Sequence, residues 1–214
     1  AGPTKEQKIV VERSLVSVGR RPNSDDLGLE EAGVGRDERG FIATDGQMRT
    51  SNPAIFAIGD VSGLPLLAHK GSKEGLVAAA VIAGGKDTWD VRAMPAAVFT
   101  DPEIATVGLG EAEAKDAGHE LRIGTFPFAA SGRALAGREA EGMMKMISDA
   151  KDDRILGVHM VGPHASELIA EAALAIEAGL TSEDLALTVH THPTLAEATM
   201  EAAEDVHRMA VHIY

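Results

Sequence analysis

The alternation of apolar and polar residues after about residue 95 predicts a sheet. Five short stretches rich in β-branched and other apolar residues follow one another, and turn residues separate them. The charged run 149–154 lies between the last two stretches and predicts a hairpin. The expected strands cover residues 96–99, 105–109, 121–128, 142–148 and 155–161.

Helical spacing of apolar residues predicts helices that flank this sheet. One short helix is expected over 111–117, and a longer one over 166–178 that ends at Gly179. Thr181 and Asp184 form a capping-box pattern, which predicts another short helix. A last helix is expected after Pro193, with Thr194 as its cap. Its expected apolar stripe is Leu195, Ala202, Val206 and Met209.

The pattern before residue 89 is typical of segments from α/β domains. The β-branched stretch 8–19 predicts strand, as do 41–43 and 55–58, and the latter ends at Gly59-Asp60. A helix of small residues is expected over 68–84. The polar linker 86–88 and the new strand signals after it place a domain boundary at about 89–95. The fold class is therefore α/β, with an antiparallel sheet and flanking helices preceded by partial Rossmann-like segments.

Composition and charge narrow the possible functions. The 214 residues carry a formal net charge of −13, so an anionic partner such as nucleic acid or a lipid surface is disfavoured. The apolar stretch 75–83 is far shorter than the roughly 20 residues that span a bilayer, and no secretory signal is recognisable, so a cytoplasmic location is expected. The absence of cysteine excludes a thiolate metal site and a cysteine nucleophile within these residues.

His192 and Glu197 are the candidate acid–base pair. A histidine just before a helix and a carboxylate in its first turn can meet, and such an imidazole can take a proton from a thiol or return it. Spacing alone favours a simpler interpretation, in which Glu197 only completes a capping box with Thr194. His190 and His192 could also form a metal-binding pair, but no third ligand is evident and no metal is expected.

Asp60 is the second candidate, because it follows an expected strand where α/β sheets bind ligands. Its carboxylate suits a ligand rich in hydroxyl groups, although it could equally cap the next helix. The amino end of that helix, at Leu66, Leu67, Ala68 and His69, would lie near the same ligand.

Five motifs in order resemble one family, the flavin-dependent pyridine-nucleotide disulfide reductases. They are residues 18–22 (VGRRP), 52–60 (NPAIFAIGD), 66–70 (LLAHK), 98–104 (VFTDPEI) and 190–197 (HTHPTLAE). Within the family, residues 132–136 and 166–172 look most like the dihydrolipoamide dehydrogenases. Glutathione reductase-like members share His-Pro-Thr and rank behind.

The resemblance implies roles for single residues and a division into domains. Gly19 would lie near NAD, Asp60 on the ribityl chain of FAD, and residues Leu66 to His69 around the flavin ring. His192 would be the acid–base group, oriented by Glu197, and would serve the disulfide of the other subunit of a homodimer. The implied domains are 1–22 (end of the NAD-binding domain), 23–90 (returning FAD-binding segment) and 91–214 (interface domain).

The implied reaction is the oxidation of dihydrolipoamide, carried on an acyltransferase partner, with NAD⁺ through FAD and a redox disulfide. The family's two cysteines and its glycine-rich flavin fingerprint are absent from these residues. The resemblance is therefore to the carboxyl-terminal portion of such an enzyme, which alone would be inactive and in which 94–214 is expected to be independently ordered. The alternative is a non-catalytic dimerisation module.

Overall fold

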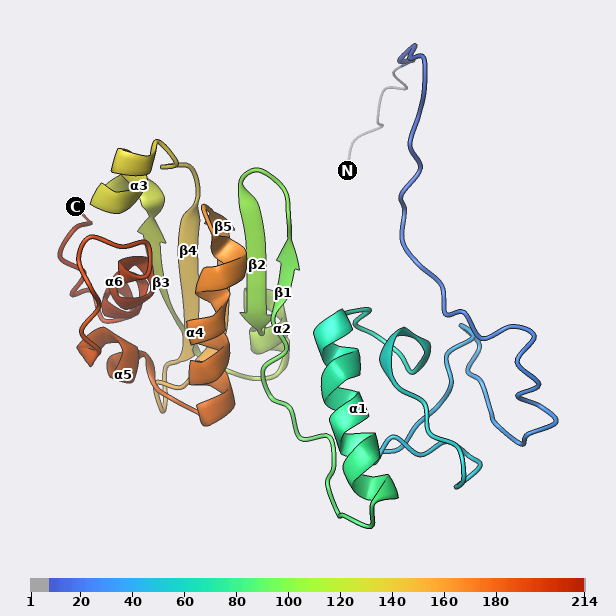
Figure 1. Ribbon diagram of the computed structural model, residues 1–214. Coiled ribbons are helices and arrows are strands. Elements are labelled where there is room, and N and C mark those ends of the chain that lie inside the picture. The colour runs from blue at the N-terminus through green and yellow to red at the C-terminus, as the bar shows by residue number, and fades with distance from the viewer. Residues whose placement is uncertain (1–7, 214) are drawn as a thin grey trace. The chain divides into compact units, whose positions relative to one another are not determined.

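The computed structural model describes residues 8–213 and divides into two compact units (Figure 1). Unit 1 is Ala1–Trp89 and unit 2 is Asp90–Tyr214. Each unit is described by itself. Within the described residues, none of the helices is long and apolar enough to cross a membrane.

Unit 2 is built on one five-stranded antiparallel sheet. Its strand order is β1-β2-β5-β4-β3, so the last strand in the chain lies in the centre. The expected strands and the β4–β5 hairpin are confirmed, with ends that shift by one or two residues. The bounds are Ala96–Val98 for β1, Glu103–Gly108 for β2, Leu121–Pro127 for β3, Met143–Asp149 for β4 and Ile155–Gly162 for β5.

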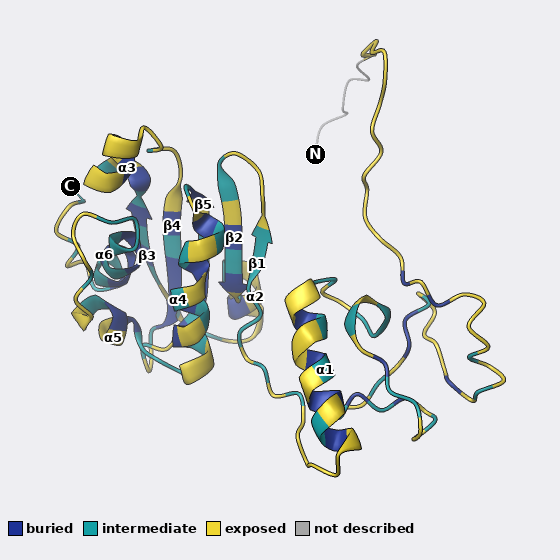
Figure 2. Cartoon of the chain, in the orientation of Figure 1, coloured by how far each residue is buried: buried dark blue, intermediate teal, exposed yellow. Residues whose placement is uncertain are grey.

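Helices pack against this sheet and bury its apolar side chains. The long helix α4 (Ala165–Ala178) lies against β2 and β5, and α6 (Glu197–Val206) lies against β3 and β4. In Figure 2 the buried residues of α4 form a stripe along the helix. Met144, Met146 and Val158 are fully buried in the core between these elements. The shorter helices are α2 (Glu111–Asp116), α3 (Gly132–Gly137) and α5 (Ser182–Leu187), with a 3₁₀ turn η2 (Phe128–Ala130).

Helix α6 approaches β3 very closely at Gly124. A Cβ atom added at Gly124 would lie 2.0 Å from the carbonyl oxygen of Ala202 and 2.5 Å from the amide nitrogen of Val206. Both of these atoms belong to the backbone of α6, which cannot move aside as a flexible side chain can. Glycine at this position therefore sets the distance between the helix and the sheet.

The helix ends follow the capping signals with one exception. Thr181 and Asp184 form the expected capping box of α5, and α4 ends at Gly179, whose φ is 71°. The expected start of the last helix is wrong, because α6 begins at Glu197 and its cap position is Ala196. The Thr194 hydroxyl instead donates to the carbonyl of Thr191 at 2.7 Å.

Two residues of the expected apolar stripe, Leu195 and Met209, lie outside α6. Ala202 and Val206 are buried as expected. Met209 is wrong as a member of the apolar stripe, because it lies beyond the end of α6 and is 62% exposed. The short helix α3 was not expected at all, although Ser131 caps it by accepting from the Ala134 amide.

Unit 1 contains one long helix, α1 (Ala68–Ile82), and a 3₁₀ turn, η1 (Gly59–Val61), that packs against it. The helix agrees with its expected range. The expected strands over 8–19, 41–43 and 55–58 are wrong, because the described residues there form only isolated bridges, Arg36 with Ile42 and Arg49 with Phe56. A strand needs a partner for its backbone groups, and Leu15 in the first segment is 92% exposed.

Candidate functional site

The side chain of His192, in the loop before α6, meets that of Glu197, the first residue of the helix. Nδ1 of His192 lies 2.8 Å from Oε1 of Glu197, while Oε2 of Glu197 accepts from the amide of Thr194 at 2.7 Å. The His192 side chain is 74% exposed and that of Glu197 is 19% exposed. The carboxylate thus holds the Nδ1 edge of the imidazole, and the rest of the ring, including Nε2, is open to a reactant.

The surroundings of Glu197 favour its ionised form. Partial burial alone would raise its pKa, but the hydrogen bonds from the Thr194 amide and from His192 outweigh burial, and the pKa lies below the usual range. These interactions contribute stability above the ordinary pKa of a glutamate, and this stability is lost as the pH falls through the lowered value. Glu197 is therefore a carboxylate at neutral pH and can orient His192.

Glu201, one helical turn beyond Glu197 on α6, forms a second histidine–glutamate pair with His212, which follows the helix. Nδ1 of His212 bonds to the buried carboxylate of Glu201, and this bond raises the pKa of His212. His192, Glu197, Glu201 and His212 all line one small hollow of about 40 Å³. Sequence reasoning missed this pair, because Glu201 and His212 are eleven residues apart and no periodic pattern links them.

His190 has a structural environment rather than that of a metal ligand. Its side chain is 6% exposed, its Nδ1 lies 2.8 Å from the Thr188 carbonyl, and its Nε2 lies 2.8 Å from Glu171. Both ring nitrogens therefore already have partners. Among the described residues, no group of three or more histidine, aspartate or glutamate side chains could hold a metal ion.

In unit 1, the turn η1 carries Asp60 beside α1. Asp60 does not cap that helix, because α1 has Leu67 at its cap position and no side-chain cap there. The Asp60 side chain is 48% exposed and pairs with Arg20 at 3.3 Å. The structure thereby brings the Gly19–Arg20 segment to Asp60.

The other residues implied by the family resemblance lie around the start of α1. Leu66 and Leu67 are half-buried just before the helix, and Ala68 and His69 are exposed in its first turn. Gly19 has a φ of 129° and lies in an exposed extended segment. His192 and Glu197 belong to unit 2, so the predicted site residues fall into one set in each unit.

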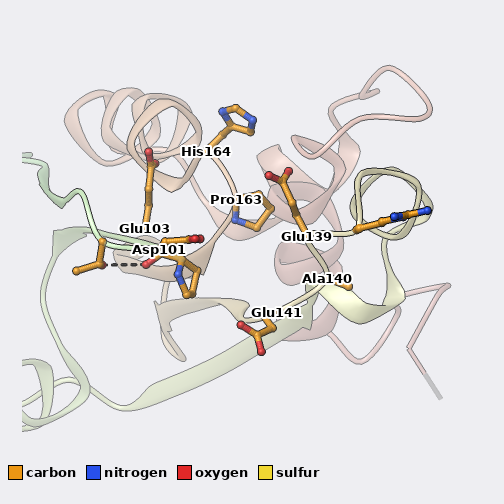
Figure 3. A pocket seen from close by; sticks show the side chains of 10 residues that line it. Asp101, Glu103, Glu139, Ala140, Glu141, Pro163 and His164 are labelled. Carbon is orange, nitrogen blue, oxygen red and sulfur yellow. Dashed lines mark hydrogen bonds between the residues drawn. The ribbon is translucent and has the colours of Figure 1, made fainter.

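An acidic cavity of about 470 Å³ contains none of the predicted site residues (Figure 3). Loops at one end of the sheet of unit 2 supply Asp101, Glu139 and Glu141 to its lining. Glu103 also lines the cavity, but it accepts from the Ser166 amide at 2.9 Å, and this bond holds its pKa below the usual range. The carboxylate of Glu103 therefore secures the start of α4.

Comparison with known proteins identifies the class. Residues 94–203 match the family described as the dimerisation domain of pyridine nucleotide-disulphide oxidoreductases, and residues 3–75 match the family described as pyridine nucleotide-disulphide oxidoreductase. The chain belongs to the pyridine nucleotide-disulphide oxidoreductases. The resemblance found in the sequence is thus confirmed.

Curated relatives narrow the class further. A dihydrolipoyl dehydrogenase of Thermus scotoductus is 56% identical over 208 residues, which are 97% of this chain and 45% of the relative. Dihydrolipoyl dehydrogenase 3 of Haloarcula marismortui is 54% identical over 96% of this chain and 43% of the relative. The chain therefore spans less than half of the length of these relatives.

Solved structures show the same fold. LpdA from Mycobacterium tuberculosis superposes with a TM-score of 0.81 at 31% identity, over 88% of this chain and 41% of that protein. The HOCl-induced flavoprotein disulfide reductase RclA from Escherichia coli also gives 0.81, at 30% identity, over 87% of this chain and 43% of that protein.

Proposed function

We propose that this chain supplies the acid–base pair of a dihydrolipoyl dehydrogenase. The observation that carries the proposal is the hydrogen bond of 2.8 Å between the exposed His192 ring and the ionised Glu197, in a chain whose relatives at 48–56% identity bear that name. A thiol substrate needs a base to become a nucleophile, since only the thiolate attacks a disulfide. His192 is the group that takes this proton.

The proposed reaction balances through a disulfide outside these cysteine-free residues. One thiol of dihydrolipoamide gives its proton to His192, and the thiolate sulfur attacks the disulfide. This attack forms a mixed disulfide and releases one redox cysteine as a thiolate. The second substrate thiol then passes its proton to that thiolate and attacks the mixed disulfide, which closes the lipoamide ring and releases the other cysteine as a thiolate. FAD supplies the step that passes two electrons and a proton on to NAD⁺ as hydride. Glu197 stabilises the imidazolium while His192 holds the proton.

The residues of unit 1 suit the cofactors of this reaction. Asp60 is a half-exposed carboxylate that can accept hydrogen bonds from the ribityl hydroxyls of FAD. The cap position of α1 is Leu67, which makes no side-chain hydrogen bond to the helix, and the first turn contains no acidic residue. The positive amino end of the helix can therefore face an electron-rich oxygen of the flavin ring near Leu66, Ala68 and His69. Gly19 is assigned to the NAD side.

The domain assignment completes this proposal. Residues 1–22 end an NAD-binding domain, 23–90 form the returning FAD-binding segment, and 91–214 form the interface domain. The reaction would take place in the cytoplasm, because a reduced dithiol substrate persists in a reducing compartment. The dithiol would be the lipoyl group of an acyltransferase partner.

We further propose that unit 2 forms a homodimer through an exposed apolar row across its sheet. Val98, Ile104, Val161 and Met143 are paired in register on neighbouring strands, so their side chains lie on one face. They are 53%, 37%, 37% and 38% exposed. A contiguous apolar surface of this kind is typical of a protein interface.

Replacing Ile104 and Val161 together by glutamate should weaken the dimer by about 30-fold or more, because buried charges would replace central apolar contacts. Analytical ultracentrifugation across a dilution series measures this. Leu174→Glu, on the 68% exposed side chain of α4, is the matched control. Equal weakening by the control, or none by the double variant, would remove the row from the interface.

The function itself is tested with a complete polypeptide that contains this chain. We expect it to reduce NAD⁺ when given dihydrolipoamide, with NADH absorbance as the readout. Turnover of glutathione disulfide with NADPH in its place would favour a glutathione reductase. No turnover of either, from a flavin-loaded preparation, would favour a dimerisation module.

A further inference from the structure

Lys70 and Glu74 form an ion pair that water hardly reaches. Nζ of Lys70 lies 2.8 Å from Oε1 of Glu74, one turn further along α1, and the two side chains are 6% and 7% exposed. It is the one ion pair of the described residues in which both side chains are less than a tenth exposed. A buried ion pair adds little net stability, because the cost of desolvating two charges offsets most of their attraction. Its presence here therefore suggests a role other than stabilising the fold.

Both charged groups hold the backbone of the turn that carries Asp60. Oε2 of Glu74 accepts from the Gly59 amide at 2.6 Å, and Nζ of Lys70 donates to the Gly59 carbonyl at 3.1 Å. The Ser62 hydroxyl, at the other end of the turn, lies 3.1 Å from each of Nζ of Lys70 and Oε2 of Glu74. The pair is therefore hydrogen-bonded to Gly59 before Asp60 and to Ser62 after it.

The backbone of the turn is also closely packed against α1. Gly59 has a φ of 77°, which glycine adopts readily and other residues rarely do. A Cβ at Gly71 would lie 3.0 Å from the Cα of Gly59, so the helix and the turn touch backbone to backbone. The nearby apolar clusters of unit 1 are small, with four and three buried residues. Polar contacts, rather than a large core, fix this turn.

We propose that Lys70 and Glu74 are positioning residues that hold η1 in the conformation in which Asp60 meets the hydroxyls of the FAD ribityl chain. This inference rests on the cofactor site proposed above. Lys70 and Glu74 would not touch FAD themselves. They would act on FAD binding by holding Gly59, and thereby Asp60, in place.

The test removes both charges together, because removing one would leave the other buried and unpaired. In a complete polypeptide containing this chain, Lys70→Met/Glu74→Leu should weaken FAD affinity at least tenfold, measured by quenching of flavin fluorescence. Lys70→Met/Glu74→Gln keeps an oxygen for the Gly59 amide and should recover part of this loss. Lys73→Met, on the exposed face of the same helix, should change nothing.

Asp60→Asn separates this inference from the proposed function. If Asp60→Asn weakens FAD binding and both double variants bind as the parent does, the positioning role is overturned and the cofactor site stands. If Asp60→Asn also binds FAD unchanged, the cofactor site and the positioning role fail together. Equal loss in the two double variants would overturn an action through Gly59.

Hydrogen exchange decides the matter if the double variants fail to fold. In a complete polypeptide containing this chain, the Gly59 amide should exchange at least a hundredfold more slowly than an unprotected amide, because Glu74 holds it. Exchange at the rate of an exposed loop would overturn the proposal.

Discussion

His192→Gln, made in a complete polypeptide that contains this chain, is expected to lower turnover with dihydrolipoamide by roughly 10²–10⁴-fold, the usual contribution of a general acid–base group. Glutamine can keep a hydrogen bond to Glu197 but cannot hold the proton of the substrate thiol. Steady-state kinetics of NADH formation measure the effect. KM should change much less than kcat, because the lost group acts on the proton rather than on binding.

The matched control is His164→Asn, which removes an exposed histidine of unit 2 outside the pair. His164 has a φ of 52°, and asparagine tolerates this conformation well. The control should retain the parent turnover. Unchanged turnover in His192→Gln would remove His192 from the mechanism, and an equal loss in the control would point to a general effect of histidine removal.

Gly124→Ala should destabilise unit 2 by about 3 kcal/mol, at the upper end of the usual range for overpacking. The added methyl would overlap the backbone of α6 at Ala202 and Val206, so the helix would have to move off the sheet. Urea unfolding of the chain, followed by circular dichroism, measures the change. Trp89 is the only tryptophan and belongs to unit 1, so its fluorescence should be the same in Gly124→Ala and in the parent.

Gly132→Ala is the control for this prediction. A Cβ at Gly132 meets nothing within 4 Å and its φ is not positive, so alanine should be neutral or slightly stabilising. If Gly124→Ala unfolds within about 0.5 kcal/mol of the parent, the close approach of α6 to β3 is not a constraint on the fold.

The two units differ in how well the sequence predicts them. The strands of unit 2 were predicted because each pairs with another strand of the same unit, so the apolar pattern and the backbone hydrogen bonds agree. The segment around Val10 and Val18 has the same β-branched pattern but forms no strand among the described residues. Local composition indicates which segments can be strands, whereas pairing decides which of them are.

The candidate site was predictable only in part. His192 and Glu197 are close in sequence, yet their spacing fits a helix cap as well, and only the ordered motifs favoured a catalytic pair. The contact of Lys70 and Glu74 with Gly59 depends on how α1 packs against η1, which no spacing reveals. For the same reason, the partnership of Glu201 with His212 requires the return of the chain after α6.

The central place of β5 has a consequence for the order in which unit 2 folds. Strands β1 and β2 form one antiparallel pair and β3 and β4 another, and β5 is hydrogen-bonded to β2 on one side and to β4 on the other. During synthesis, the two strand pairs would leave the ribosome first. No hydrogen bonds of the sheet would join one pair to the other until β5, which ends at Gly162, has also left it. Closing the sheet joins residues about 60 positions apart, which slows folding. We therefore expect the native sheet of this unit to form only after β5 has been synthesised.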